Sequence, residues 1–162
     1  MMTIDNEALA QRLGDKLRDL EAVVTTAESC TGGGVAYCIT AIPGSSRWFD
    51  RGFVTYTNRS KREMLGVSTD ILAKFGAVSE KTAIAMAAGA LQHSQAQYVL
   101  AITGIAGPGG GTAEKPVGTV CFAWAGTGRD VISKTVVFSG DRSAVRQQSV
   151  QTALQGMLDF IR

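Results

Sequence analysis

The stretch of residues 25–34, Thr-Thr-Ala-Glu-Ser-Cys-Thr-Gly-Gly-Gly, constrains this chain more than any other part of its sequence. A β-prone run, residues 22–26, leads into it, and an apolar run compatible with a helix, residues 35–42, leads out of it. A strand that passes through small polar residues and glycines into a helix brings a side chain and several backbone N–H groups to the edge of a sheet. The stretch predicts a reactive or anion-binding turn, or else an ordinary turn whose Ser or Thr caps a helix.

Hydrophobic periodicity predicts that helices and strands alternate along the rest of the chain. Residues 98–103 are almost continuously apolar, which is typical of a central buried strand, and the short turn at 126–130 predicts an antiparallel hairpin. Asn58, Ser79 and Asp141 are the expected N-caps of three helices. We expect helices over about 5–20, 32–42, 58–65, 69–75, 79–94 and from 141 to the end of the chain, and strands over 22–28, 52–57, 98–103, 117–125 and 131–138.

This order of elements predicts one domain over residues 1–162, with a three-layer α/β/α architecture. Its sheet should be mixed and mostly parallel, with an antiparallel hairpin at its C-terminal end. The helix expected over 79–94 has an alanine-rich apolar face, which would serve a core or a dimer interface equally well. We expect the chain to form a homo-oligomer, a dimer.

Composition and charge exclude several classes of function. The net charge of +2 is too small to indicate nucleic-acid or membrane binding, and no apolar run reaches the ~18 residues of a membrane span. The charged N-terminal stretch lacks the apolar region of a signal peptide. Cys30, Cys38 and Cys121 are odd in number and lack metal-ligand spacing. We therefore expect reduced thiols in a cytoplasmic protein, with no metal and no cofactor.

The single histidine, His93, limits the chemistry that a nucleophilic serine could use. A Ser-His-Asp triad needs a histidine beside the serine, whereas His93 falls at the exposed end of a predicted helix. Lys61 is a candidate base because it falls in the first turn of the helix that starts at Asn58. The helix dipole and burial would both lower its pKa from ~10.4 toward the ~7–8 useful to a base. The alternative is an ordinary solvated surface lysine.

Polar residues follow three predicted strands, and ligands in α/β sheets bind beyond the carboxyl ends of strands. These clusters are residues 28–31, Tyr56 with Lys61, and Thr103-Gly104. If the three strands are parallel neighbours, the clusters meet at the same edge of the sheet. The glycine-rich residues 104–111 would make either an anion-binding nest or a flexible loop. Arg142 opens the last predicted helix, so it would either bind an anion or be a surface charge.

Seven sequence blocks, taken together, resemble the CinA C-terminal domain family, most closely its stand-alone bacterial members. The resemblance covers about residues 5–160 and implies an amidohydrolase without a cofactor. Its substrate would be nicotinamide mononucleotide (NMN), hydrolysed to nicotinate mononucleotide and ammonia in pyridine nucleotide recycling. The blocks are Thr-Ala-Glu-Ser-Cys-Thr-Gly-Gly (26–33), Pro-Gly-Ser-Ser (43–46), Gly-Phe-Val-Thr-Tyr (52–56), Gly-Ala-Val-Ser-Glu (76–80), Thr-Gly-Ile-Ala-Gly-Pro-Gly-Gly (103–110), Lys-Pro-Val-Gly-Thr-Val (115–120) and Gly-Asp-Arg (140–142).

The resemblance also implies a Ser/Lys pair, with Ser29 as the nucleophile and Lys61 as the base. Tyr56 or Thr103 would relay the proton between them. Arg142 or the loop that starts at Gly104 would bind the 5′-phosphate. The turn after Ser29 would supply the oxyanion hole and substrate contacts from Glu28, Cys30, Thr31, Gly32 and Gly33, where Glu28 would orient the site or a substrate hydroxyl.

Two alternatives stay open. Cys30 adjoins Ser29 and thiols are intrinsically more reactive, but Cys30 has no obvious basic partner. The same glycine-rich loops would also suit a catalytically silent module that binds a nucleotide or a partner, although an intact Ser29, Lys61 and Tyr56 argue against that interpretation.

Overall fold

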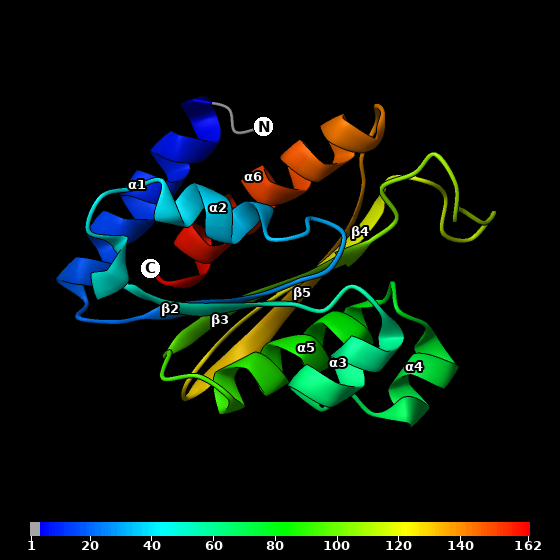
Figure 1. The fold of residues 1–162 in the computed structure, drawn as a ribbon, viewed down its shortest axis with the longest axis horizontal. Helices are drawn as coiled ribbons and strands as arrows, with labels where there is room; N and C mark the ends of the chain where they lie inside the picture. Colours follow the sequence, from blue (N-terminus) through cyan, green and yellow to red (C-terminus); the bar gives the residue numbers. More distant parts are fainter. Residues whose placement is uncertain (1–3) are drawn as a thin grey trace.

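A five-stranded mixed sheet separates two layers of helices (Figure 1). The computed structural model describes residues 4–162, and residues 1–3 of the predicted domain lie outside the described residues. The strands, in the sheet order β2-β1-β3-β4-β5, are β1 (Val24–Glu28), β2 (Phe49–Val54), β3 (Tyr98–Gly104), β4 (Thr119–Gly126) and β5 (Arg129–Val137). The helices are α1 (Ile4–Asp19), α2 (Gly34–Thr40), the 3-10 helix η1 (Ser45–Arg47), α3 (Asn58–Leu65), α4 (Thr69–Phe75), α5 (Glu80–Gln92) and α6 (Arg142–Phe160).

The strand directions bring three chain segments to one edge of the sheet. β1 pairs in parallel with β2 and β3, and β4 pairs antiparallel with β3 and β5, so β4 alone in this sheet runs opposite to the other four strands. The predicted α/β/α fold, with a mostly parallel mixed sheet and a C-terminal antiparallel hairpin, is confirmed. Because β1, β2 and β3 are parallel, the loops after their carboxyl ends meet at the same edge.

Each face of the sheet has its own hydrophobic core. On the face covered by α1, α2 and α6, the rings of Phe122 and Trp124 stack with their planes 6° apart. On the other face α5 packs on the sheet, flanked by α3 and α4 (Figure 1). The alanines Ala83, Ala87 and Ala90 of α5 are fully buried in that second core. The alanine-rich face therefore serves the core, which was one of its two predicted roles.

The N-cap of α3 differs from the prediction by one residue, although the helix spans the predicted range. β2 begins and ends earlier than the predicted strand, so residues 55–57 form a loop. Thr57, not Asn58, is the N-cap: its side chain accepts from Ser60 N–H, and Ser60 Oγ accepts from Thr57 N–H. This reciprocal capping box satisfies two donors at the helix start. It leaves Lys61 in the first turn of α3, as the sequence predicts.

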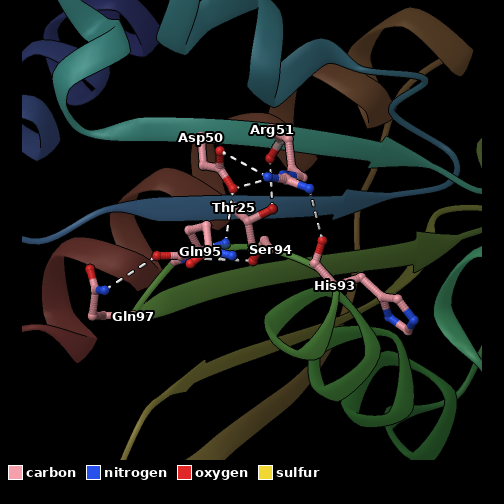
Figure 2. Close-up of polar contacts among 8 residues, drawn as sticks. Thr25, Asp50, Arg51, His93, Ser94, Gln95 and Gln97 are labelled. Atoms are coloured by element: carbon pink, nitrogen blue, oxygen red, sulfur yellow. Dashed lines mark hydrogen bonds and ion pairs between the residues drawn. The ribbon is translucent and has the colours of Figure 1, made fainter.

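A polar cluster joins the amino-terminal halves of β1 and β2 to the loop before β3 (Figure 2). Thr25 Oγ1 donates to Arg51 O at 2.6 Å, and Arg51 Nη1 donates to His93 O at 3.2 Å. The Gln95 N–H donates to Asp50 Oδ2 at 3.0 Å. His93 therefore lies before the start of β3, at the opposite end of this strand from the edge described above. Its position supports the exclusion of a Ser-His mechanism.

Gly89 lets α3 and α5 approach each other closely. A Cβ atom built on Gly89 would lie 1.9 Å from the carbonyl oxygen of Leu65, the last residue of α3. Real Cβ atoms do not come that close to backbone atoms, so only glycine permits this contact. Since Lys61 lies on α3, the contact also positions Lys61 above the sheet edge.

Replacing Gly89 with alanine should destabilise the protein although alanine is the better helix former by about 1 kcal/mol. We expect Gly89→Ala to lower the free energy of unfolding by about 1–3 kcal/mol, because α3 must shift to relieve the clash. Urea unfolding measures this change. Ala88→Gly, at the exposed neighbouring position, is the control and should cost only the helix propensity of about 1 kcal/mol. A Gly89→Ala protein as stable as the original would contradict the packing argument.

Candidate active site

A cleft of about 270 Å³ opens at the edge where β1, β2 and β3 end. The predicted convergence of three polar clusters at one edge is what the structure shows. The walls also include the glycine-rich loop, through Ile105, Ala106, Gly107, Gly109 and Gly110. The sequence-predicted residues that line the cleft are Ser29, Cys30, Tyr56, Lys61, Thr103, Gly104 and Arg142.

A buried serine and lysine meet at the base of this cleft. Lys61 Nζ lies 3.0 Å from Ser29 Oγ and donates a second hydrogen bond of 2.8 Å to Thr55 O. Lys61 is 1% exposed although its side chain ends in a charged group. Lysines are almost never buried this fully unless they are paired. Ser29 lies in the turn that follows β1, and Lys61 lies on α3. The fold therefore brings together two residues that are far apart in the sequence.

Burial changes the protonation of Lys61. Removal of the ammonium from water lowers the pKa of Lys61 to about 8, while the smaller electrostatic effect of Cys30 raises it. The described residues that line the cleft include no carboxylate that would restore the positive charge. At pH 7 about a tenth of Lys61 is therefore the neutral amine, far more than for a lysine with the ordinary pKa of ~10.4, and a neutral amine next to a serine hydroxyl can accept its proton.

Glu28 holds the turn that carries Ser29. Its fully buried carboxylate accepts hydrogen bonds from Thr31 Oγ1 at 2.6 Å and from the N–H groups of Val35 and Ala36 at 3.0 Å each. These N–H groups belong to the first turn of α2, which favours a negative charge. Of the two predicted roles, these contacts favour orienting the site: Glu28 lies outside the lining of the cleft, and its carboxylate is hydrogen-bonded to the protein.

The glycines after Ser29 shape the turn and lie outside the cleft lining, as does Thr31. The Gly32 N–H donates to Ser29 O at 2.9 Å. Gly33, at the N-cap of α2, has a φ of 97°, which a residue with a side chain would adopt only with strain. Of the residues in this turn predicted to form an oxyanion hole, Cys30 is therefore the one that lines the cleft beside Ser29.

The Cys30 thiol is a poor nucleophile in this environment. Burial, reinforced by the Glu28 charge, raises its pKa to about 12. Since the thiolate is the reactive form, almost none of it is present at neutral pH. This observation argues against the alternative in which Cys30 attacks the substrate.

Neither Tyr56 nor Thr103, the two predicted proton relays, lies between Lys61 and Ser29 in the structure. Thr103 Oγ1 donates to Ala77 O at 2.8 Å, and Tyr56, which is 58% exposed, accepts from Arg142 Nη2 at 2.9 Å. Lys61 contacts Ser29 directly instead. Tyr56 and Arg142 lie at the open end of the cleft, where they are available to a ligand.

Arg142 and Arg146 both reach the site from the start of α6. Arg142 Nη1 donates to Gly107 O at 2.6 Å, within the glycine-rich loop. Arg146, which sequence reasoning missed, donates from Nε to Cys30 O at 3.2 Å and from Nη2 to Thr31 O at 3.3 Å. The available signal was its spacing: a residue four positions after Arg142 lies on the same face of a helix.

Two further classes of site find no support among residues 4–162. Among residues 6–162 of this part of the chain, no group of three or more His, Cys, Asp or Glu side chains is arranged to hold a metal ion. No helix within it has both the length and the apolar character needed to cross a bilayer.

Fold and site together define a class of protein: an α/β/α domain with a buried serine–lysine pair in a cleft at the carboxyl ends of its parallel strands. The chain belongs to the CinA C-terminal domain family, whose model matches residues 6–161. The family resemblance predicted from the seven sequence blocks is thereby confirmed.

Two bacterial relatives and one solved structure illustrate this membership. The chain is 54% identical over 147 residues to the nicotinamide-nucleotide amidohydrolase PncC of Escherichia coli K12, covering 91% of this chain and 89% of that one. It is 53% identical over 152 residues to the PncC of Pseudomonas putida, covering 94% of each. The crystal structure of the competence/damage inducible protein CihA from Agrobacterium tumefaciens matches with a TM-score of 0.98 and 47% identity, covering 100% of this chain and 99% of that one.

The buried lysine should make stability depend on pH. The pKa of Lys61 in the folded protein is about 8, below the ~10.4 of an unfolded lysine, so the unfolded state binds more protons between these values. The free energy of unfolding should therefore rise with pH across this window, and the buried ammonium should cost about 3 kcal/mol below it. In urea unfolding, the advantage of Lys61→Met over the original protein should be largest below pH 8 and shrink toward pH 10.

Lys81→Met is the control, because Lys81 is exposed and its loss should change stability equally at all pH values. An advantage of Lys61→Met that stays constant with pH would mean that burial does not perturb the lysine.

Proposed function

We propose that this protein is an amidohydrolase that converts NMN and water to nicotinate mononucleotide and ammonia. The observation that carries the proposal is the 3.0 Å contact between Lys61 Nζ and Ser29 Oγ, made by a lysine whose burial lowers its pKa to about 8. The substrate is taken from relatives that are nicotinamide-nucleotide amidohydrolases and that align over nearly the whole chain. A nucleophile next to its base is the arrangement that acyl transfer requires.

In the acylation step, neutral Lys61 accepts the Ser29 proton while Oγ attacks the carboxamide carbon. Thr55 O binds one N–H of the amine and so leaves its lone pair free for the Ser29 proton. The carbonyl oxygen becomes an oxyanion, which the Cys30 N–H would stabilise. The Lys61 ammonium then protonates the amide nitrogen, the C–N bond breaks, and ammonia leaves behind an ester on Ser29.

Water completes the reaction by the same route. Lys61 takes a proton from the water, whose oxygen attacks the ester carbon. When the C–O bond to Ser29 breaks, Lys61 returns this proton to Oγ, and the carboxylic acid product releases its own proton to solvent and leaves as a carboxylate. One lysine therefore acts as base and then as acid in both half-reactions.

The charges around the cleft suit an anionic nucleotide. The described lining residues include two basic side chains, Lys61 and Arg142, and no acidic one. Arg142 lies at the N-terminus of α6, where the helix dipole also favours an anion. We infer that Arg142 and the backbone of residues 107–110 bind the 5′-phosphate, which leaves the pyridinium carboxamide to reach Ser29.

The alternative, a module that binds a nucleotide without reacting with it, would use the same cleft. It would not require the buried pair, because the burial of Lys61 costs stability and is not needed to bind a phosphate at the open end. The buried pair therefore favours the enzyme.

Ammonia release from NMN separates these possibilities. Ser29→Ala and Lys61→Met should each lower kcat by at least about a thousandfold, while Cys30→Ala and the exposed-lysine control Lys74→Met should stay within a few-fold of the original protein. Below pH 8, kcat/KM should fall with falling pH as Lys61 becomes protonated. A protein that binds NMN in calorimetry but releases no ammonia would be the silent module, and loss of activity in Cys30→Ala with retention in Ser29→Ala would transfer the role of nucleophile to the thiol.

We also propose that two copies associate through β5, one of the two edge strands of the sheet. Val131, Ile132 and Val137 are 41%, 53% and 58% exposed on it. An antiparallel pairing of two β5 strands centred on Ile132 would place Asp130 opposite Lys134 of the second copy, twice by symmetry.

The three cysteines are free and buried, which suits the reducing cytoplasm in which we place the protein.

Light scattering tests the dimer. The original protein should have twice the mass of its chain, and Ile132→Lys should be monomeric because like charges would face each other at the symmetry axis. Tyr37→Lys, at an exposed hydrophobic position on α2, should leave the dimer intact. A monomeric original protein, or a dimer that survives Ile132→Lys, would contradict the proposed interface.

A further inference from the structure

Helix α6 contacts both ends of the candidate active site through one face. Arg142 and Arg146 are one turn apart on it, so their side chains lie side by side. Arg142 reaches the open end of the cleft through Gly107 O and Tyr56 Oη. Arg146 reaches the turn after Ser29 through two carbonyl oxygens. A single helix thus joins the end proposed to hold the phosphate to the end that carries the nucleophile.

The start of α6 is well anchored. Asp141 caps it by accepting a hydrogen bond from Ala144 N–H at 2.9 Å, and Val145 and Ser149, on the buried face of α6, are fully buried. Further along, the Trp124 indole donates to Ala153 O at 3.0 Å, which ties the helix to β4. The arginines therefore extend from a fixed support, so that what one contacts constrains the position of the other.

The two carbonyls that Arg146 contacts belong to the peptide units that close the nucleophile turn. Each peptide unit is planar and trans, so its C=O and N–H point in opposite directions. Thr31 O shares a peptide unit with the Gly32 N–H, and this N–H is the donor to Ser29 O. Cys30 O shares the preceding unit with the Thr31 N–H. Holding both carbonyls therefore fixes the orientation of the units that follow Ser29.

We infer that Arg146 is a positioning residue, which keeps the Ser29 turn and its oxyanion donor aligned with the substrate phosphate bound at the other end of the same helix turn. The inference rests on the proposed function for its substrate. Arg146 acts through the backbone of Cys30 and Thr31 and lies outside the lining of the cleft. Glu28 holds the side chain of Thr31, so that Thr31 is held from both sides.

The charge of Arg146 also reaches the residue next to the nucleophile. At the Cys30 thiol, burial and the Glu28 charge raise the pKa, and the Arg146 guanidinium is the first of the nearby cations that oppose them. A positive charge that is felt at Cys30 would also favour an oxyanion forming beside it.

Kinetics with two substrates test the inference: NMN and its dephosphorylated nucleoside, nicotinamide riboside. Arg146→Met should lower kcat for NMN by about tenfold or more with little change in KM, because a small misalignment is costly to the reaction and not to binding. Arg146→Lys should recover part of the loss. The preference for NMN over the nucleoside should shrink in Arg146→Met, since the phosphate no longer helps to align the nucleophile. Gln151→Met, at an exposed position on α6, should behave as the original protein.

A kcat unchanged in Arg146→Met would overturn the inference. So would an equal loss for both substrates, which would show a structural role without coupling to the phosphate.

Hydrogen exchange provides a readout that does not depend on activity. In Arg146→Met the Gly32 amide should exchange faster by about tenfold, while the Val145 amide in the core-facing part of α6 should not change. Unchanged protection at Gly32 would overturn the inference even if the protein released no ammonia. An original protein that is inactive on NMN but shows the faster Gly32 exchange in Arg146→Met would contradict the proposed function alone.

Discussion

The hydrogen bond between Lys61 Nζ and Ser29 Oγ, made away from solvent, is the contact on which the rest of the site depends. An amine in water would be protonated at neutral pH and could not accept a proton. Burial without a nearby acid lowers its pKa to about 8. The cost of about 3 kcal/mol is a large share of the 5–15 kcal/mol typical of protein stability, so the surrounding fold must supply it.

The fold supplies this stability through packing that has no direct part in the chemistry. Gly89 allows α3 to rest against α5, and the capping box at Thr57 starts α3 at the right residue. Glu28 binds the first N–H groups of α2 and so keeps the turn after β1 closed. Each of these contacts positions either the lysine or the serine. A 1 Å displacement of either would already be costly to a reaction between them.

A serine–lysine pair does not require a histidine in the cleft. The single histidine of the chain, His93, lies before the start of β3, at the opposite end of that strand. A histidine base needs a third residue to orient its ring and stabilise its charged form. A lysine needs only a dry environment and one acceptor for its remaining hydrogen, here Thr55 O. The absence of carboxylates among the described lining residues then serves two purposes. It leaves the lysine pKa low, and it leaves the cleft without negative charges that would repel an anion.

The sequence by itself determined the elements and the fold class, and it singled out Ser29 and Lys61 as the candidate pair. Periodic apolar residues, glycines and capping residues act over a few positions, so local patterns are sufficient to place helices, strands and the turn at 25–34. Local patterns could not decide which atoms meet. The tertiary structure paired Glu28 with the start of α2, placed Cys30 on the lining of the cleft, and brought Arg146 onto the turn after Ser29. These outcomes depend on contacts between residues far apart in the chain, and so does the burial of Lys61, because only the packed protein excludes the water that would keep a lysine charged.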